Sequence, residues 1–226
     1  MIWRSGGNAS ALRKISSAAL YSILQVIEKS SHDSDISSLA YFILSQENLP
    51  VLLSNMSDDY DSSIRQLICS SIHLSLKAIT KQEDALLKSN GNLIHNECNS
   101  LLGDELSKLL DDSNNFVRIQ ACATLPSFFH FVALTYHEGN ATKEMNQLLE
   151  TLLFVHLDDV VIQENVYEVL SVFISNLKAM KIDSTFFHQK IYKALQQLYT
   201  SKGKELCKHL LEKLLVVLSK EIENDE

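Results

Sequence analysis

The chain has 226 residues, of which 6 are glycine and 2 are proline, about 3.5 per cent where roughly 12 per cent is average. So few turn residues disfavour β-sandwiches, collagen-like repeats and flexible linkers, and with leucine spread throughout they predict an almost entirely helical protein. A net charge of −8 argues against nucleic-acid binding, which requires a basic stripe.

The charge is distributed unevenly along the chain. Residues 1–176 carry 11 basic and 21 acidic side chains, net −10, whereas residues 177–226 carry 9 basic and 7 acidic, net +2. Two interpretations stay open at this point. Either the composition of a solvated surface varies along the chain, or an acidic body steers a basic partner toward it.

Cysteine usage and the absence of a leader indicate a reducing compartment, cytosol or nucleus. The four cysteines are Cys69, Cys98, Cys122 and Cys207, and their spacings match no CxxC pair or zinc pattern, so buried, reduced thiols are expected. No basic segment followed by an apolar stretch opens the chain. The charge-free run at 119–137 contains a proline and two histidines and continues a helical pattern, so we expect no membrane span.

Apolar residues at a 3.6-residue period predict helices along most of the chain. In chain order these are 9–29, 34–46, a short piece at 49–56, 60–80, 93–111, 114–137, 142–157, 160–178, 184–200 and 204–222. A polar loop is expected at 88–92. Pro126 lies inside the sixth helix, where it removes one backbone donor and should kink the helix.

The apolar pattern recurs four times at nearly constant spacing. Its first aliphatic positions are Leu12, Ile64, Val117 and Ile162; the positions four and eight residues later are Ser16, Ile68, Ala121 and Val166, then Leu20, Ile72, Leu125 and Leu170. The copies are therefore 52, 53 and 45 residues apart. One hairpin cannot bury such a stripe, but stacked neighbours can. The sequence therefore predicts an all-α fold, an α-solenoid of stacked antiparallel helical hairpins.

Charged residues accompany each copy of the pattern. Pairs of aspartates precede the last three copies, at 58–59, 111–112 and 158–159, where a carboxylate caps free backbone N–H groups and complements the helix dipole. An arginine follows the aliphatic residue in the first three copies, and Gln163 replaces it in the fourth. We expect Asp112 to cap the helix that begins near Asn114.

This combination of aspartate, aliphatic residue and arginine resembles the HEAT repeat, one of the HEAT/armadillo-like helical repeats. In that family, aspartates and arginines of neighbouring repeats form a ladder along the stack. By this resemblance the ladder and cap residues would be Arg13, Asp59, Arg65, Asp112, Arg118 and Asp158. Gln163 departs from the pattern, so the last junction would lack its arginine.

We expect residues 1–226 to form a single HEAT-repeat solenoid. The chain opens with only the second helix of a hairpin, whereas a solenoid normally carries a polar capping repeat at its end. The expected domain is therefore the C-terminal fragment of a longer array. The last expected helix, with four lysines and the acidic tail 221–226, has the composition of a C-terminal cap.

Three stretches resemble a more specific family, the HEAT-repeat dynein axonemal assembly factors. They are the tryptophan-containing opening at 2–13, the segment 108–118 with its following apolar residues, and the segment 153–159. The resemblance implies a cytoplasmic scaffold or co-chaperone in the preassembly of outer and inner dynein arms for ciliary motility. Implied partners are axonemal dynein chains, including intermediate chains, chaperones and other assembly factors, with neither nucleic acid nor membrane.

The sequence offers no pattern that carries catalysis or a cofactor. It contains no P-loop, GxSxG, HExxH or GxGxxG motif. The pairs Cys69/His73 and His95/Cys98 have helical spacing, but a structural zinc needs four ligands and a catalytic one usually three. We therefore expect no catalytic, cofactor-binding or metal residues. A non-enzymatic protein-binding role is expected, and a generic HEAT-repeat adaptor of the transport or phosphatase-scaffold type stays open as the alternative.

Overall fold

The computed structural model describes residues 7–29, 33–58, 60–81, 96–135, 147–152, 162–176 and 212. Within these ranges the regular elements are all α-helices, and no strand occurs there. The helices are α1 (Gly7–Lys29), α2 (Asp33–Ile43), α3 (Leu49–Asp58), α4 (Ser62–Thr80), α6 (Asn96–Leu110), α7 (Asn115–Thr135) and α9 (Gln163–Asn176), and residues 147–152 are also helical. The all-helical prediction is confirmed for this part of the chain.

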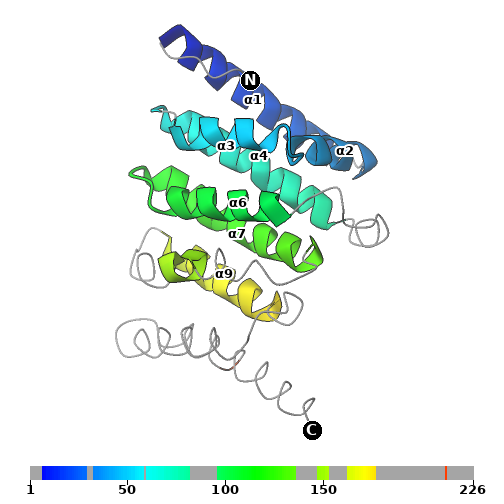
Figure 1. Ribbon diagram of the computed structural model, residues 1–226, viewed down its shortest axis with the longest axis vertical. Helices are drawn as coiled ribbons and strands as arrows, with labels where there is room; N and C mark the ends of the chain where they lie inside the picture. The colour runs from blue at the N-terminus through cyan, green and yellow to red at the C-terminus, as the bar shows by residue number, and fades with distance from the viewer. Residues whose placement is uncertain are drawn as a thin grey trace.

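The helices lie in successive layers that follow the order of the chain (Figure 1). Helix α1 lies at one end, followed by a layer of α2, α3 and α4, then by α6 and α7, and then by α9. Helix α4 packs against both α1 and α7, and α7 packs against both α4 and α9. Short connections join α3 to α4 and α6 to α7, so each of these pairs forms a hairpin.

Helix α7 lies inside the stack, with helices packed on several sides. Its apolar residues include Phe128, Phe129 and Phe131, all fully buried, and the Phe129 ring packs edge-on against Phe173 of α9 with centroids 4.8 Å apart. By length and composition α7 is the one helix in the described ranges that could cross a membrane. Its contacts with α4, α6 and α9 account for the same composition, because a helix surrounded by neighbours needs apolar residues on several sides.

Burial of the repeat positions separates the first copy from the others. The nine positions of the later copies are all fully buried: Ile64, Ile68, Ile72, Val117, Ala121, Leu125, Ile162, Val166 and Leu170. In the first copy, by contrast, Leu12 is 66% exposed, Ser16 is exposed and Leu20 is only partly buried. The repeat register therefore predicts core positions correctly wherever a paired helix covers them.

The helix expected at 34–46 ends earlier, at Ile43, because side chains terminate it. Asn48 donates through Nδ2 to the Phe42 carbonyl at 3.0 Å and to Ser45 Oγ at 3.1 Å. Pro50 then occupies the first turn of α3, where its missing N–H has no cost. The other described helix bounds lie within a few residues of those expected. Helix α7 continues through Pro126, and the helices expected at 184–200 and 204–222 and the loop at 88–92 lie outside the described residues.

Candidate functional site

An ion pair joins α4 to the start of α7 at one edge of the stack. Arg65 donates through Nε to Asp112 Oδ2 at 2.7 Å and through Nη2 to Asp112 Oδ1 at 2.9 Å. The two side chains are only 11% and 8% exposed. Two parallel hydrogen bonds to one carboxylate fix both distance and orientation, so this pair sets how α7 docks on α4.

A second pair joins α1 to the start of α4, but through a residue that the repeat alignment did not select. Lys14 Nζ lies 3.1 Å from Asp61 Oδ2 and 3.3 Å from Ser63 Oγ. The pairs Lys14–Asp61 and Arg65–Asp112 both span 47 residues of sequence. Arg13, the repeat equivalent of Arg65, is nearly buried at 9% exposure. Asp59, which matches Asp112 in its repeat, lies outside the described residues, so a pair between Arg13 and Asp59 stays a prediction.

The caps differ from those expected. Asp61 caps α4, since its carboxylate accepts from the Ser63 backbone N–H at 2.9 Å. Helix α7 is capped by Asn114, whose Oδ1 accepts from the backbone N–H of Phe116 at 2.9 Å. The prediction that Asp112 caps α7 is wrong: its Oδ1 instead accepts the Asn114 backbone N–H at 2.8 Å, in the turn before the helix. That turn places the carboxylate beside Arg65.

The other expected ladder residues are only partly described. Arg118 donates through Nη1 to the Asp112 backbone carbonyl at 3.1 Å, so it supports the same turn that holds the carboxylate. Asp59 and Asp158 lie outside the described residues, as does the side chain of Gln163. The structure thus places Arg65, Asp112 and Arg118 together, and the role of the ladder at the last junction stays a prediction.

Electrostatics at this edge favour ionised carboxylates. Burial alone raises the pKa of Asp112, but hydrogen bonds from Arg65 and from the Asn114 backbone outweigh it, and the pKa lies below the ordinary value. The pKa of Asp61 is also lowered, because the Ser63 N–H and Lys14 outweigh the effect of burial. Both carboxylates are therefore ionised at neutral pH.

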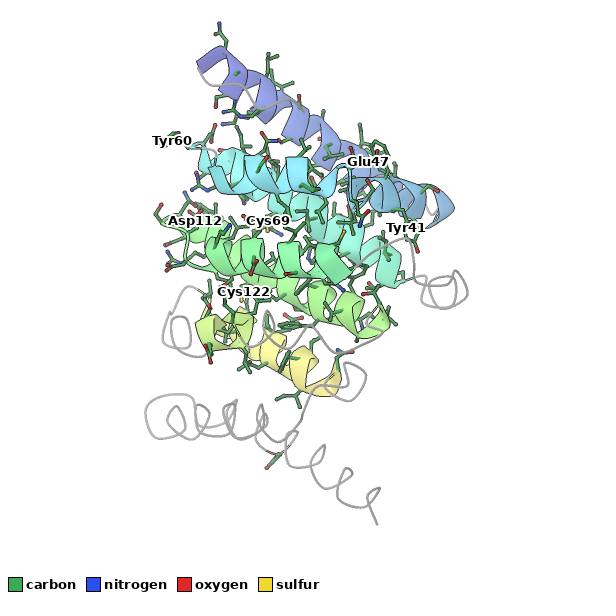
Figure 2. The ribbon with its side chains drawn as sticks, in the orientation of Figure 1. Tyr41, Glu47, Tyr60, Cys69, Asp112 and Cys122 are labelled. Carbon is green, nitrogen blue, oxygen red and sulfur yellow. The ribbon has the colours of Figure 1, made fainter. Side chains whose placement is uncertain are left out.

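Two exposed aromatic residues accompany the two pairs. Tyr60, directly before the capping Asp61, is fully exposed, and Phe116, two residues after Asn114, is 67% exposed. Figure 2 shows Tyr60 and Asp112 on the same edge of the stack, whereas Cys69 and Cys122 lie inside it. We call the edge formed by Lys14, Tyr60, Asp61, Asp112 and Phe116 the ladder edge. Exposed aromatic side chains beside fixed charges are the composition of a protein-binding surface.

A second open surface lies at the α1 end of the stack. Leu12, Ile15, Ile23 and Val26 of α1 are 50–67% exposed. Beside them a groove with a cavity of about 170 Å³ opens between α1, α2 and α3. It is lined by Leu20, Leu39, Phe42, Ile43, Asn48, Val51 and Leu52. Phe42 and Val51 are themselves partly exposed, at 64% and 38%, so the groove is apolar and reaches the surface.

The cysteines and His73 serve packing in the described structure. Cys69 Sγ lies 3.5 Å from Thr124 Oγ1, between α4 and α7, and Cys98 donates through Sγ to the Leu44 carbonyl at 3.7 Å. Burial raises the pKa of Cys69 and of Cys122 to about 12, so neither is a thiolate at neutral pH. Burial lowers the pKa of His73. No group of three or more potential metal ligands occurs among the described residues, and His95 lies outside them.

Taken together, these observations describe a protein of stacked helices, all-helical in the described residues, with exposed aromatic side chains at the ladder edge and exposed apolar side chains on α1. Among curated proteins, the chain is similar to Dynein axonemal assembly factor 5 of Mus musculus, with 29% identity over 171 residues. The resemblance predicted from the sequence is thus confirmed. The match covers 74% of this chain but only 18% of the relative's length. No family model matches the chain, and no solved structure matches it.

Proposed function

We propose that this chain is a non-enzymatic scaffold segment in the cytoplasmic preassembly of axonemal dynein arms. The observation that carries this proposal is the similarity to a dynein axonemal assembly factor over 74% of the chain. The layered helices agree with it, because stacked helical repeats expose large, rigid surfaces that suit the holding of other proteins. Its architecture in this proposal is one HEAT-type solenoid over residues 1–226.

The partners in this proposal are axonemal dynein chains together with chaperones and other assembly factors, and the contact surface is the ladder edge. Tyr60 and Phe116 supply exposed aromatic area, which typically dominates binding energy at protein interfaces. The Arg65–Asp112 pair behind them is nearly buried and holds α4 and α7 in register, so the two aromatic residues are presented on a rigid frame.

Affinity purification of the tagged chain from cells that build motile cilia tests the proposal. We expect axonemal dynein chains among the recovered proteins, and their recovery should fall several-fold when Tyr60→Ala and Phe116→Ala are combined. Leu101→Ala is the matched control, because Leu101 is an exposed apolar residue (40%) on α6, and it should change nothing. Recovery of transport receptors or phosphatase subunits without dynein chains would instead support a generic helical-repeat adaptor.

A further inference from the structure

Tyr60 is the most exposed of the tyrosines whose side chains the structure describes. Its side chain is fully in solvent, at 103% exposure, and Figure 2 shows it at the edge of the stack, away from the core. Tyr21 and Tyr41 are both partly buried, and the Tyr21 hydroxyl accepts a hydrogen bond from Gln25 Nε2 at 2.8 Å. An enzyme that modifies the folded chain can therefore reach the Tyr60 hydroxyl without unpacking the ring.

This exposed tyrosine belongs to an internal layer of the stack. Tyr60 lies between α3 and α4, and this layer packs against α1 on one side and against α6 and α7 on the other. The backbone is not helical here, because Tyr60 lies in a bend and Asp61 is extended, with φ −80° and ψ 105°. A tyrosine in this conformation can enter a narrow active site, whereas a tyrosine within a helix is hindered by the side chains one turn away.

The charges next to Tyr60 in the sequence indicate which class of enzyme would recognise it. Asp58 and Asp59 directly precede the tyrosine, and Asp61 directly follows it. Lys14, which lies 3.1 Å from the Asp61 carboxylate, offsets one of these negative charges and leaves the segment acidic. Because complementary charges select binding partners, the substrate groove that fits this segment is basic.

We propose that Tyr60 is phosphorylated by a protein tyrosine kinase with a basic substrate groove, and that the phosphate releases a partner bound at the ladder edge. In this step the Tyr60 Oη attacks the γ-phosphorus of ATP, the bond from that phosphorus to ADP breaks, and the phenol proton passes to a carboxylate of the kinase. The release rests on the proposed function, because it takes the ladder edge as the surface that binds dynein chains.

The phosphate acts on the ladder edge through its charge. At neutral pH it adds about −1.5 to −2 charges to a ring that directly precedes Asp61. A phosphate beside carboxylates resists desolvation within an interface, so the ring no longer serves as an apolar contact. Phe116 and the nearly buried Arg65–Asp112 pair are not modified, so phosphorylation should lower partner binding without changing the fold.

Kinase treatment of the purified chain tests the modification. The probe is ATP with the catalytic domain of a tyrosine kinase that phosphorylates a glutamate–tyrosine copolymer, and mass spectrometry of the digested chain locates the phosphate. Phosphate should appear at Tyr60 at least about tenfold faster than at Tyr21 or Tyr41, because packing protects those two rings until the structure opens locally. Equal rates at the three tyrosines, or no phosphate at Tyr60 while the copolymer is phosphorylated, would overturn the proposal.

Capture of proteins from cells that build motile cilia tests the release. The phosphorylated chain should recover at least about tenfold less axonemal dynein chain than the untreated chain does, and phosphatase treatment should restore the recovery. Tyr60→Phe keeps the ring but cannot accept phosphate, so its recovery should be equal before and after kinase treatment. An untreated chain that recovers no dynein chain refutes the proposed function and with it the release, whereas unchanged or increased recovery after phosphorylation refutes the release alone.

Discussion

Truncation of Leu125 on α7 should destabilise the stack far more than truncation of Leu20 on α1. Both residues occupy the same position of the repeat, but Leu125 is fully buried whereas Leu20 is partly buried beside the groove of about 170 Å³. Leu→Ala at a fully buried site costs ~2.7–5 kcal/mol, depending on how far the surroundings collapse into the cavity. Three helices pack on α7 and limit that collapse, so we expect about 3–4 kcal/mol for Leu125→Ala.

For Leu20→Ala we expect about 1–2 kcal/mol, because solvent already reaches one side of the residue and less apolar area leaves water on folding. Urea unfolding monitored by circular dichroism measures both changes. With a slope of about 2 kcal/mol per molar urea, the midpoints should fall by roughly 1.5–2 M for Leu125→Ala and by 0.5–1 M for Leu20→Ala. Leu101→Ala makes the same substitution at an exposed site on α6, so it controls for effects of the substitution that do not depend on burial.

The reasoning is refuted if Leu20→Ala lowers the midpoint as much as Leu125→Ala does. In that case α1 would have to be covered in solution over the surface that the structure leaves open near Leu20. Because helical stacks depart from two-state unfolding when layers separate, hydrogen exchange of α7 and α1 amides should accompany the urea measurement. Leu125→Ala should accelerate exchange in α7 and its neighbours before it does so in α1.

Further outcomes follow from the ladder edge and the buried thiols. Asp112 has a lowered pKa, so its contribution to the free energy of unfolding is present above the unfolded pKa near 4 and is lost as pH falls through the folded pKa. Asp112→Asn should therefore flatten the decline of the unfolding free energy below that unfolded pKa. Arg65→Ala should cost about 1.5–3 kcal/mol in thermal or urea unfolding, since it strands a nearly buried carboxylate. Asp61→Ala should cost about 1 kcal/mol as a lost helix cap, with Asp61→Asn retaining most of the cap, as helicity and melting will show. Cys69 and Cys122, with pKa values of about 12, should resist iodoacetamide at pH 8 until the chain unfolds, and mass spectrometry of the alkylated protein measures this.

The sequence predicted the helices and the core positions well because both depend on a local signal. A 3.6-residue period selects Ile64, Val117 and Ile162 as buried positions without any knowledge of tertiary contacts. The early end of α2 was missed because it depends on Asn48 bonding back to the Phe42 carbonyl, a contact that periodicity does not report.

The charged edge was predicted less completely than the core. The alignment of the sequence copies selected Arg65 and Asp112, which do pair. It gave no reason to expect the Lys14–Asp61 pair, because that pair depends on the direction in which a side chain leaves the helix, and a change of one residue rotates that direction by about 100°. The cap of α7 was misassigned because Asp112 and Asn114 are both of residue types that suit a helix start. Only the backbone geometry shows that Asn114 is the cap.

The layered order of contacts also determines how the chain would respond to tension. Because α4 packs against α1 on one side and against α7 on the other, a force applied along the stack is transmitted in series from one helix interface to the next. Each interface then bears the whole load, so the weakest of them sets the force at which the stack yields. The α1–α4 interface is held by ion pairs with solvent-exposed lysines, Lys14–Asp61 and Lys77–Glu28, whereas α4 and α7 share the nearly buried Arg65–Asp112 pair. Of these two interfaces, the one between α1 and α4 should yield first under load and leave α4 and α7 packed together.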